Sequence, residues 1–166
     1  YPIDPGMDGL EGSLTNWLNR GIDAVHGYQP RLHEPVTLGE RTYVPMEVGE
    51  KLGYALLERS ITGRYRIAHT SSGNAPFRCG VIEENGGKQL LFQGRNTFGE
   101  IDRVQITLDR GYEYELKLPR KEVFFIHTGV DSRIPTGLAS VEQITLYDGE
   151  GQDITESFFM SMGGIQ

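Results

Sequence analysis

Two neighbouring segments of the chain alternate between apolar and polar residues. Residues 103–109 place Val104, Ile106 and Leu108 on one side of an extended backbone and polar residues on the other. Residues 112–118 repeat the pattern, with aromatic and leucine side chains alternating with charged ones. A period of two is typical of a strand with one buried face, and charges on the opposite face indicate an antiparallel sheet.

The same kind of signal recurs from residue 41 onward, at intervals of roughly ten residues. The pattern predicts nine strands: Arg41–Val48, Ala55–Ser60, Tyr65–Thr70, Phe77–Glu83, Lys88–Gln93, Arg103–Asp109, Tyr112–Leu118, Glu122–Thr128 and Ser140–Tyr147. Gly, Asn and Asp cluster between them, and these residues supply the backbone conformations of tight turns. Short strands joined by such turns predict an all-β fold, an antiparallel β-sandwich of the jelly-roll type.

The first 40 residues follow a different pattern. Apolar residues recur at the spacing of one helix face, which predicts a short N-terminal helix; they are Leu10, Leu14, Trp17, Leu18, Ile22 and Val25. We therefore divide the chain into an arm with an amphipathic helix (residues 1–40) and a β-sandwich domain (residues 41–166). The helix either packs on its own domain or docks on a partner subunit.

Composition and charge exclude several classes of protein. The chain has 166 residues, 22 of them glycine, without the strict three-residue period of collagen. Its formal net charge of −7 disfavours nucleic-acid binding, which needs a basic surface. No segment approaches the length of a membrane-spanning helix. Cys79 is the only cysteine, so an intrachain disulfide cannot form, and we interpret it as a small buried side chain.

A search for catalytic motifs gives no positive signal. The sequence lacks the spacing of a zinc site, of a nucleophile elbow and of a phosphate-binding loop. His69 and His127 both lie near predicted strand ends and could share a metal ion if the fold brought them together. The sequence thus favours a noncatalytic protein.

Four stretches resemble one known family. Residues 53–58 (GYALLE) and 62–71 (TGRYRIAHTS) resemble a strand, a small turn and a Gly-x-Tyr strand of the galactose-binding-like jelly rolls. Residues 104–111 (VQITLDRG) and 139–146 (ASVEQITL) resemble later strands of the same fold. This group includes the family 6 and family 35 type carbohydrate-binding modules.

The resemblance implies a site and a metal ion. Sugar would bind in a loop cleft by stacking on Tyr54 and Phe98, with polar contacts from Arg95, Asn96, Asp131 and Arg133. In this family a structural Ca²⁺ is held by acidic residues of the first and last strands, and the matching positions here are Glu47 or Glu50, and Glu142. Such a module would be secreted or otherwise extracellular.

Three functions stay open at this point. The first is a noncatalytic module that binds carbohydrate through its loop aromatics. The second is a structural or assembly domain whose N-terminal arm docks a partner subunit. The third is an enzyme on a jelly-roll scaffold, since a fold alone does not determine function.

Overall fold

The computed structural model describes residues 2–3, 7, 9–20 and 29–163. The chain divides into two compact units, Tyr1–Ala75 and Pro76–Gln166. The boundary expected after residue 40 falls inside the first unit, because the residues before it pair or pack with the strands that follow it. The predicted residues Ile22 and Val25 of the helical pattern lie outside the described residues.

The first unit is an antiparallel sheet with one helix. Its strand order is β1-β6-β5-β4-β2, with β3 also paired to β4. The elements are β1 (Pro2–Ile3), α1 (Leu10–Leu18), β2 (Arg31–Leu32), β3 (Val36–Leu38), β4 (Arg41–Val48), β5 (Lys51–Arg59) and β6 (Tyr65–Gly73).

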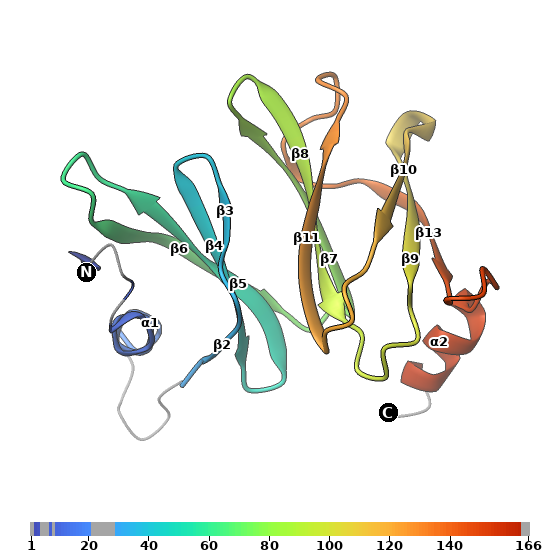
Figure 1. The fold of residues 1–166 in the computed structure, drawn as a ribbon, viewed down its shortest axis with the longest axis horizontal. Coiled ribbons are helices and arrows are strands. Elements are labelled where there is room, and N and C mark those ends of the chain that lie inside the picture. The colour runs from blue at the N-terminus through green and yellow to red at the C-terminus, as the bar shows by residue number, and fades with distance from the viewer. Residues whose placement is uncertain (1, 4–6, 8, 21–28, 164–166) are drawn as a thin grey trace. The chain divides into compact units, whose positions relative to one another are not determined.

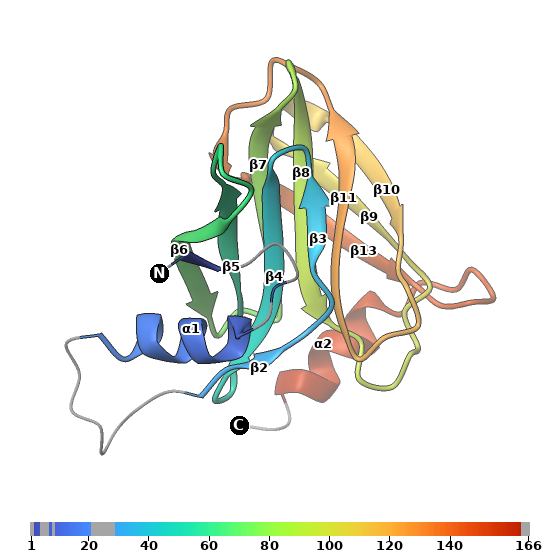
Figure 2. The same ribbon diagram turned by 60° about the vertical axis from the view of Figure 1, so that its left-hand side comes forward.

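Helix α1 packs on this sheet (Figure 2). Leu10 and Leu14 are buried in one cluster with Val44, Met46 and Leu57 of the sheet. The helix begins after Gly9, whose φ of 76° is left-handed, and no side chain caps it. The apolar face predicted from the sequence is therefore used within its own unit.

The second unit is a β-sandwich. One sheet has the order β11-β8-β7-β12 and the other has the order β10-β9-β13. The elements are β7 (Phe77–Glu84), β8 (Gly87–Arg95), β9 (Arg103–Leu108), a 3₁₀ turn η2 (Asp109–Gly111), β10 (Glu113–Lys117), β11 (Val123–Val130), β12 (Gly137–Leu138), β13 (Val141–Tyr147) and α2 (Thr155–Gly163).

A single core joins the two sheets of this unit, which face each other in Figure 1. Leu90 and Phe92 of β8 pack in one cluster with Val104 and Ile106 of β9 and with Leu146 of β13. The burial of β9 alternates along the strand, as its sequence predicts. The predicted all-β class, the sandwich and the short N-terminal helix are confirmed.

The sequence did not predict α2 or the short strands β1, β2, β3 and β12. Helix α2 carries Phe158, which stacks on Phe77 with ring centroids 5.6 Å apart. Its apolar residues are Phe158, Phe159, Met160 and Met162, a run too short to show a helical period clearly. Strands of two or three residues give no periodic signal at all.

Candidate functional site

The six residues predicted to bind ligand occupy three separate places. Tyr54 lies on β5 in the first unit, and the other five lie in the second. Arg95, Asn96 and Phe98 lie at the end of β8 and in the loop that follows it. Asp131 and Arg133 follow β11. Because β11 runs antiparallel to β8, with Val123 opposite Arg95 and Val130 opposite Lys88, the last two groups lie at opposite ends of this sheet.

Tyr54 is part of a packed aromatic row on the sheet of the first unit. Its ring meets Tyr43 edge-on with centroids 5.3 Å apart, and His69 edge-on at 5.8 Å. The side chain is half-buried. These contacts give Tyr54 a structural role, since edge-to-face pairs stabilise a fold beyond the area they bury.

Phe98 is the most exposed aromatic residue in the described part of the second unit. It lies in the loop between β8 and β9, and 87% of its surface is accessible to solvent. The loop around it is held by Asn96, which is only 2% exposed. The Asn96 side chain donates from Nδ2 to the Ile101 carbonyl at 2.9 Å and accepts from the Ile101 N–H at 3.1 Å. Phe98 is therefore exposed to solvent on a loop whose conformation is fixed by the hydrogen bonds of Asn96.

A second loop lies beside the Phe98 loop. The backbone N–H of Asn96 donates to the Glu122 carbonyl at 2.7 Å, so residues 119–122 run next to it. Arg120 and Lys121 of this second loop are exposed, and Arg95 at the end of β8 is half-buried. The loop that carries Phe98 therefore lies beside a loop with two exposed basic residues, and the Asn96 side chain is used inside its own loop.

Asp131 and Arg133 form a closed ion pair at the other end of the sheet. Nε and Nη2 of Arg133 each donate to an Asp131 carboxylate oxygen at 2.9 Å. The hydrogen bonds from Arg133 lower the pKa of Asp131 from 3.8 to about 2. Tyr114 accepts the Asp131 backbone N–H on its hydroxyl at 2.9 Å, which fixes the start of the loop.

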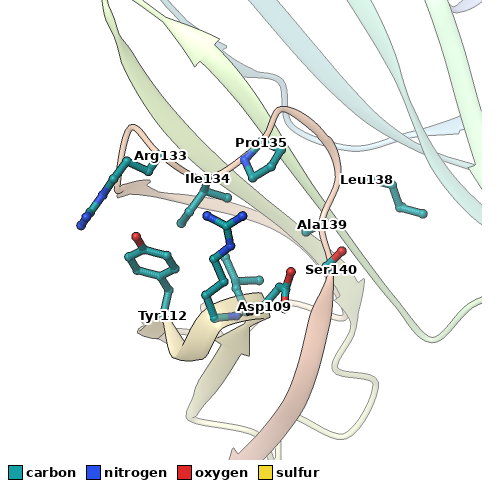
Figure 3. Close-up of a pocket in the computed structure, with 10 residues that line it drawn as sticks. Asp109, Tyr112, Arg133, Ile134, Pro135, Leu138, Ala139 and Ser140 are labelled. Carbon is teal, nitrogen blue, oxygen red and sulfur yellow. Dashed lines mark hydrogen bonds between the residues drawn. The ribbon is translucent and has the colours of Figure 1, made fainter.

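A shallow pocket of about 80 Å³ adjoins this ion pair. Figure 3 shows Tyr112 and Arg133 on one side of the pocket and Asp109, Ala139 and Ser140 on the other. The Arg133 guanidinium lies 5.7 Å from the centre of the Tyr112 ring. Arg133 is the one predicted ligand residue that lines this pocket.

The sequence did not single out Asp109, Arg110 or Tyr112 as site residues. Asp109-Arg110-Gly111 has the composition of a hairpin turn, and Tyr112 fits the alternating pattern of the next strand. The turn interpretation is correct, because η2 joins β9 to β10, whereas Tyr112 lies directly before β10 and outside it. Only the β11–β12 loop, which is distant in sequence, completes the pocket.

The predicted calcium ligands also fall in different places. Glu47 already has polar partners in its own unit, because its Oε2 lies 3.0 Å from His33 Nε2 and 3.7 Å from Arg31 Nη1. Glu50 lies in the β4–β5 turn, and Glu142 is exposed on β13 in the second unit. Residues 2–3, 7, 9–20 and 29–163 contain no group of three or more His, Cys, Asp or Glu that could hold a metal ion. The calcium site stays a prediction.

The remaining candidates for chemistry have ordinary surroundings. His69 belongs to the first unit and His127 to the second, where its Nδ1 lies 3.1 Å from Gln89 Oε1. Burial raises the pKa of the Cys79 thiol to about 12, which keeps it protonated and a poor nucleophile at neutral pH.

Comparisons with known proteins add no relative. No protein-family model, curated protein or solved structure matches this chain. Among the described residues, no helix is both long and apolar enough to span a membrane.

Proposed function

We propose that the chain is a noncatalytic β-sandwich module that binds carbohydrate through Phe98. One observation carries the proposal, namely an almost fully exposed aromatic ring on a loop that a buried asparagine fastens. An exposed phenylalanine contributes little to the stability of the fold, because its ring buries almost no apolar surface.

The chemistry of the loop fits a sugar. The apolar C–H face of a pyranose ring stacks on an aromatic face, and nearby polar groups select among hydroxyls. Arg120 and Lys121 are exposed on the neighbouring loop, which is hydrogen-bonded to the loop that carries Phe98. A loop that is already fixed loses little conformational freedom when a ligand binds.

The proposal differs from the sequence prediction in its residues. Tyr54 is left out because it packs against Tyr43 and His69 in the other unit. Asp131 and Arg133 are left out because they lie at the opposite end of the sheet. An extracellular location, where polysaccharides are found, belongs to the same proposal.

An assembly role through the N-terminal helix finds less support. Leu10 and Leu14, the apolar residues that would dock a partner, are buried against the sheet of their own unit. The arm would have to use a different surface for docking.

The test is calorimetric titration of the whole chain with neutral and acidic oligosaccharides. We expect millimolar to micromolar dissociation constants, equivalent to about −4 to −8 kcal/mol. Phe98→Ala should abolish binding, while Phe98→Trp, with a larger ring, should retain or strengthen it.

The matched control is Ile61→Ala, which removes another fully exposed apolar side chain from a turn in the first unit. It should leave binding unchanged. The proposal fails if no oligosaccharide binds the wild-type chain, or if Phe98→Ala binds as well as the wild type.

A further inference from the structure

The pocket beside η2 contains a guanidinium that the rest of the described chain does not use. Arg110 lines the pocket. Its backbone N–H donates to Asp109 Oδ1 at 3.0 Å. No carboxylate or carbonyl in the part of the chain that the structure describes contacts its guanidinium. The Arg110 guanidinium is therefore available to a ligand. A carboxylate suits it, because guanidinium groups bind carboxylates through two parallel hydrogen bonds.

The other arginine of the pocket, Arg133, already has a carboxylate partner. Arg133 is held by both oxygens of Asp131. It is therefore fixed in place, and its charge is already balanced. The contrast assigns the two arginines different roles: Arg133 shapes the wall above Tyr112, and Arg110 is the group that can take an anion.

The charges around the pocket favour an anion. Two cations, Arg110 and Arg133, line the pocket. A third, Lys88, lies behind the wall, where its ammonium donates to the Ile134 carbonyl. Two carboxylates, Asp109 and Asp131, oppose them. The sum over these five side chains is positive in a chain whose net charge is −7, which favours an anion at this pocket.

The rest of the lining is apolar. Ile134, Pro135 and Leu138 of the β11–β12 segment border the pocket, and Leu138 is 92% exposed. The ring of Tyr112 adds an aromatic surface. A ligand that satisfies both parts of the pocket has a negative group and a small apolar body.

We propose that this pocket binds the carboxylate of a small organic acid or of a peptide C-terminus, with Arg110 as the partner of the carboxylate. Tyr112 and Leu138 contact the apolar body of the ligand. The site is separate from the Phe98 loop, because it lies at the other end of the β8–β11 sheet, so either proposal can fail without the other.

The backbone of Arg110 suggests the variant to use. Its φ of 66° is left-handed, a conformation that asparagine and glycine adopt more readily than arginine. Arg110→Asn therefore removes the guanidinium without disturbing the turn, and its thermal midpoint should equal or exceed that of the wild type. Arg110→Gly is the second variant if the first folds poorly.

The test is titration of the whole chain with phenylacetate and with its neutral isostere phenylacetamide. We expect the acid to bind and the amide to bind at least about tenfold more weakly, because a hydrogen-bonded ion pair is lost. Arg110→Asn should weaken phenylacetate binding by a similar factor. Arg59→Gln, which removes an exposed arginine from the end of β5 in the first unit, should have no effect.

A second pair of ligands identifies the source of the carboxylate. Acetyl-alanyl-phenylalanine carries a C-terminal carboxylate that its amide lacks. Binding of the free peptide acid supports capture of a peptide C-terminus, and binding of phenylacetate alone supports a small organic acid. The proposal is overturned if neither acid binds, if the amides bind equally well, or if Arg110→Asn binds the acids like the wild type.

Discussion

The two ends of the β8–β11 sheet are built in opposite ways. At one end a polar side chain, Asn96, is buried so that an apolar ring, Phe98, can be exposed. At the other end the exposed side chain of Arg133 pairs with the half-buried carboxylate of Asp131. The first arrangement presents a rigid apolar surface, and the second presents a charged pocket.

The two ends therefore differ in how much their polar side chains contribute to the stability of the fold. A buried amide whose hydrogen bonds to Ile101 are both made holds its loop in place, whereas an ion pair near the surface contributes little to stability. Removing the buried Asn96 side chain should therefore affect folding strongly, whereas changes to the charged residues at the other end should mainly affect titration and anion binding.

Removing the buried amide should have the largest effect. Asn96→Ala leaves the N–H and carbonyl of Ile101 without their partners, so we expect a loss of about 2–4 kcal/mol in the free energy of unfolding. Chemical denaturation measures it. Thr97→Ala, at an exposed position of the same loop, should change stability by less than about 0.5 kcal/mol. Equal effects of the two substitutions would contradict the role of Asn96.

Adding a methyl group at Gly94 should have the next largest effect. Gly94 lies opposite both Phe77 and Phe124 in the sheet. A Cβ there would come within 2.4 Å of the Phe77 ring and 2.7 Å of the Phe124 ring. Gly94→Ala should therefore destabilise the fold by about 1–3 kcal/mol.

Gly129→Ala in the neighbouring strand is the control for this crowding. The closest atom to its Cβ would be Gln89 Nε2 at 3.7 Å, an ordinary contact. Both variants are compared by thermal unfolding. If Gly129→Ala is as damaging as Gly94→Ala, the cost comes from replacing a strand glycine and the two rings are not its cause.

The ion pair between Asp131 and Arg133 should be detectable in the titration of the Asp131 carboxyl. The pKa of Asp131 is lowered from 3.8 to about 2 in the folded chain. A lowered carboxyl pKa stabilises the fold above the unfolded pKa, and this contribution is lost as the pH falls from about 4 through 2. An NMR titration of the Asp131 carboxyl should show the low midpoint, and Arg133→Gln should return it toward 3.8. An unchanged midpoint in that variant would mean that Arg133 is not the cause.

The smallest effect is expected for Phe98 itself. The ring is 87% exposed, so Phe98→Ala should change the free energy of unfolding by less than about 0.5 kcal/mol. A larger loss in denaturant unfolding would show that the ring packs on the protein and is not presented to a ligand.

The longer strands could be predicted because each has enough residues to show its period. Arg41–Val48 was predicted with the bounds it has, and the alternation of Val104, Ile106 and Leu108 matches their burial. Helix α1 followed from the spacing of Leu10 and Leu14. Local patterns of this kind depend on neighbours in sequence, which the chain displays directly.

The site could be predicted only in part, because it depends on neighbours in space. Phe98 was singled out correctly as a loop aromatic, but nothing local shows that Asn96 is buried beneath the loop. Arg133 was grouped with Arg95 although strand register puts them at opposite ends of the sheet. Arg110 sits in an ordinary turn sequence, and its place in a pocket depends on a loop more than twenty residues later.

The most direct test of carbohydrate binding locates the ligand on the chain. Backbone amide resonances are followed by NMR while an oligosaccharide that binds in calorimetry is added to the wild-type chain. The account predicts that the largest shift changes fall on residues 95–101 and on the neighbouring loop 119–122. Changes centred on the pocket beside η2 or on Tyr54, with residues 95–101 unaffected, would contradict it.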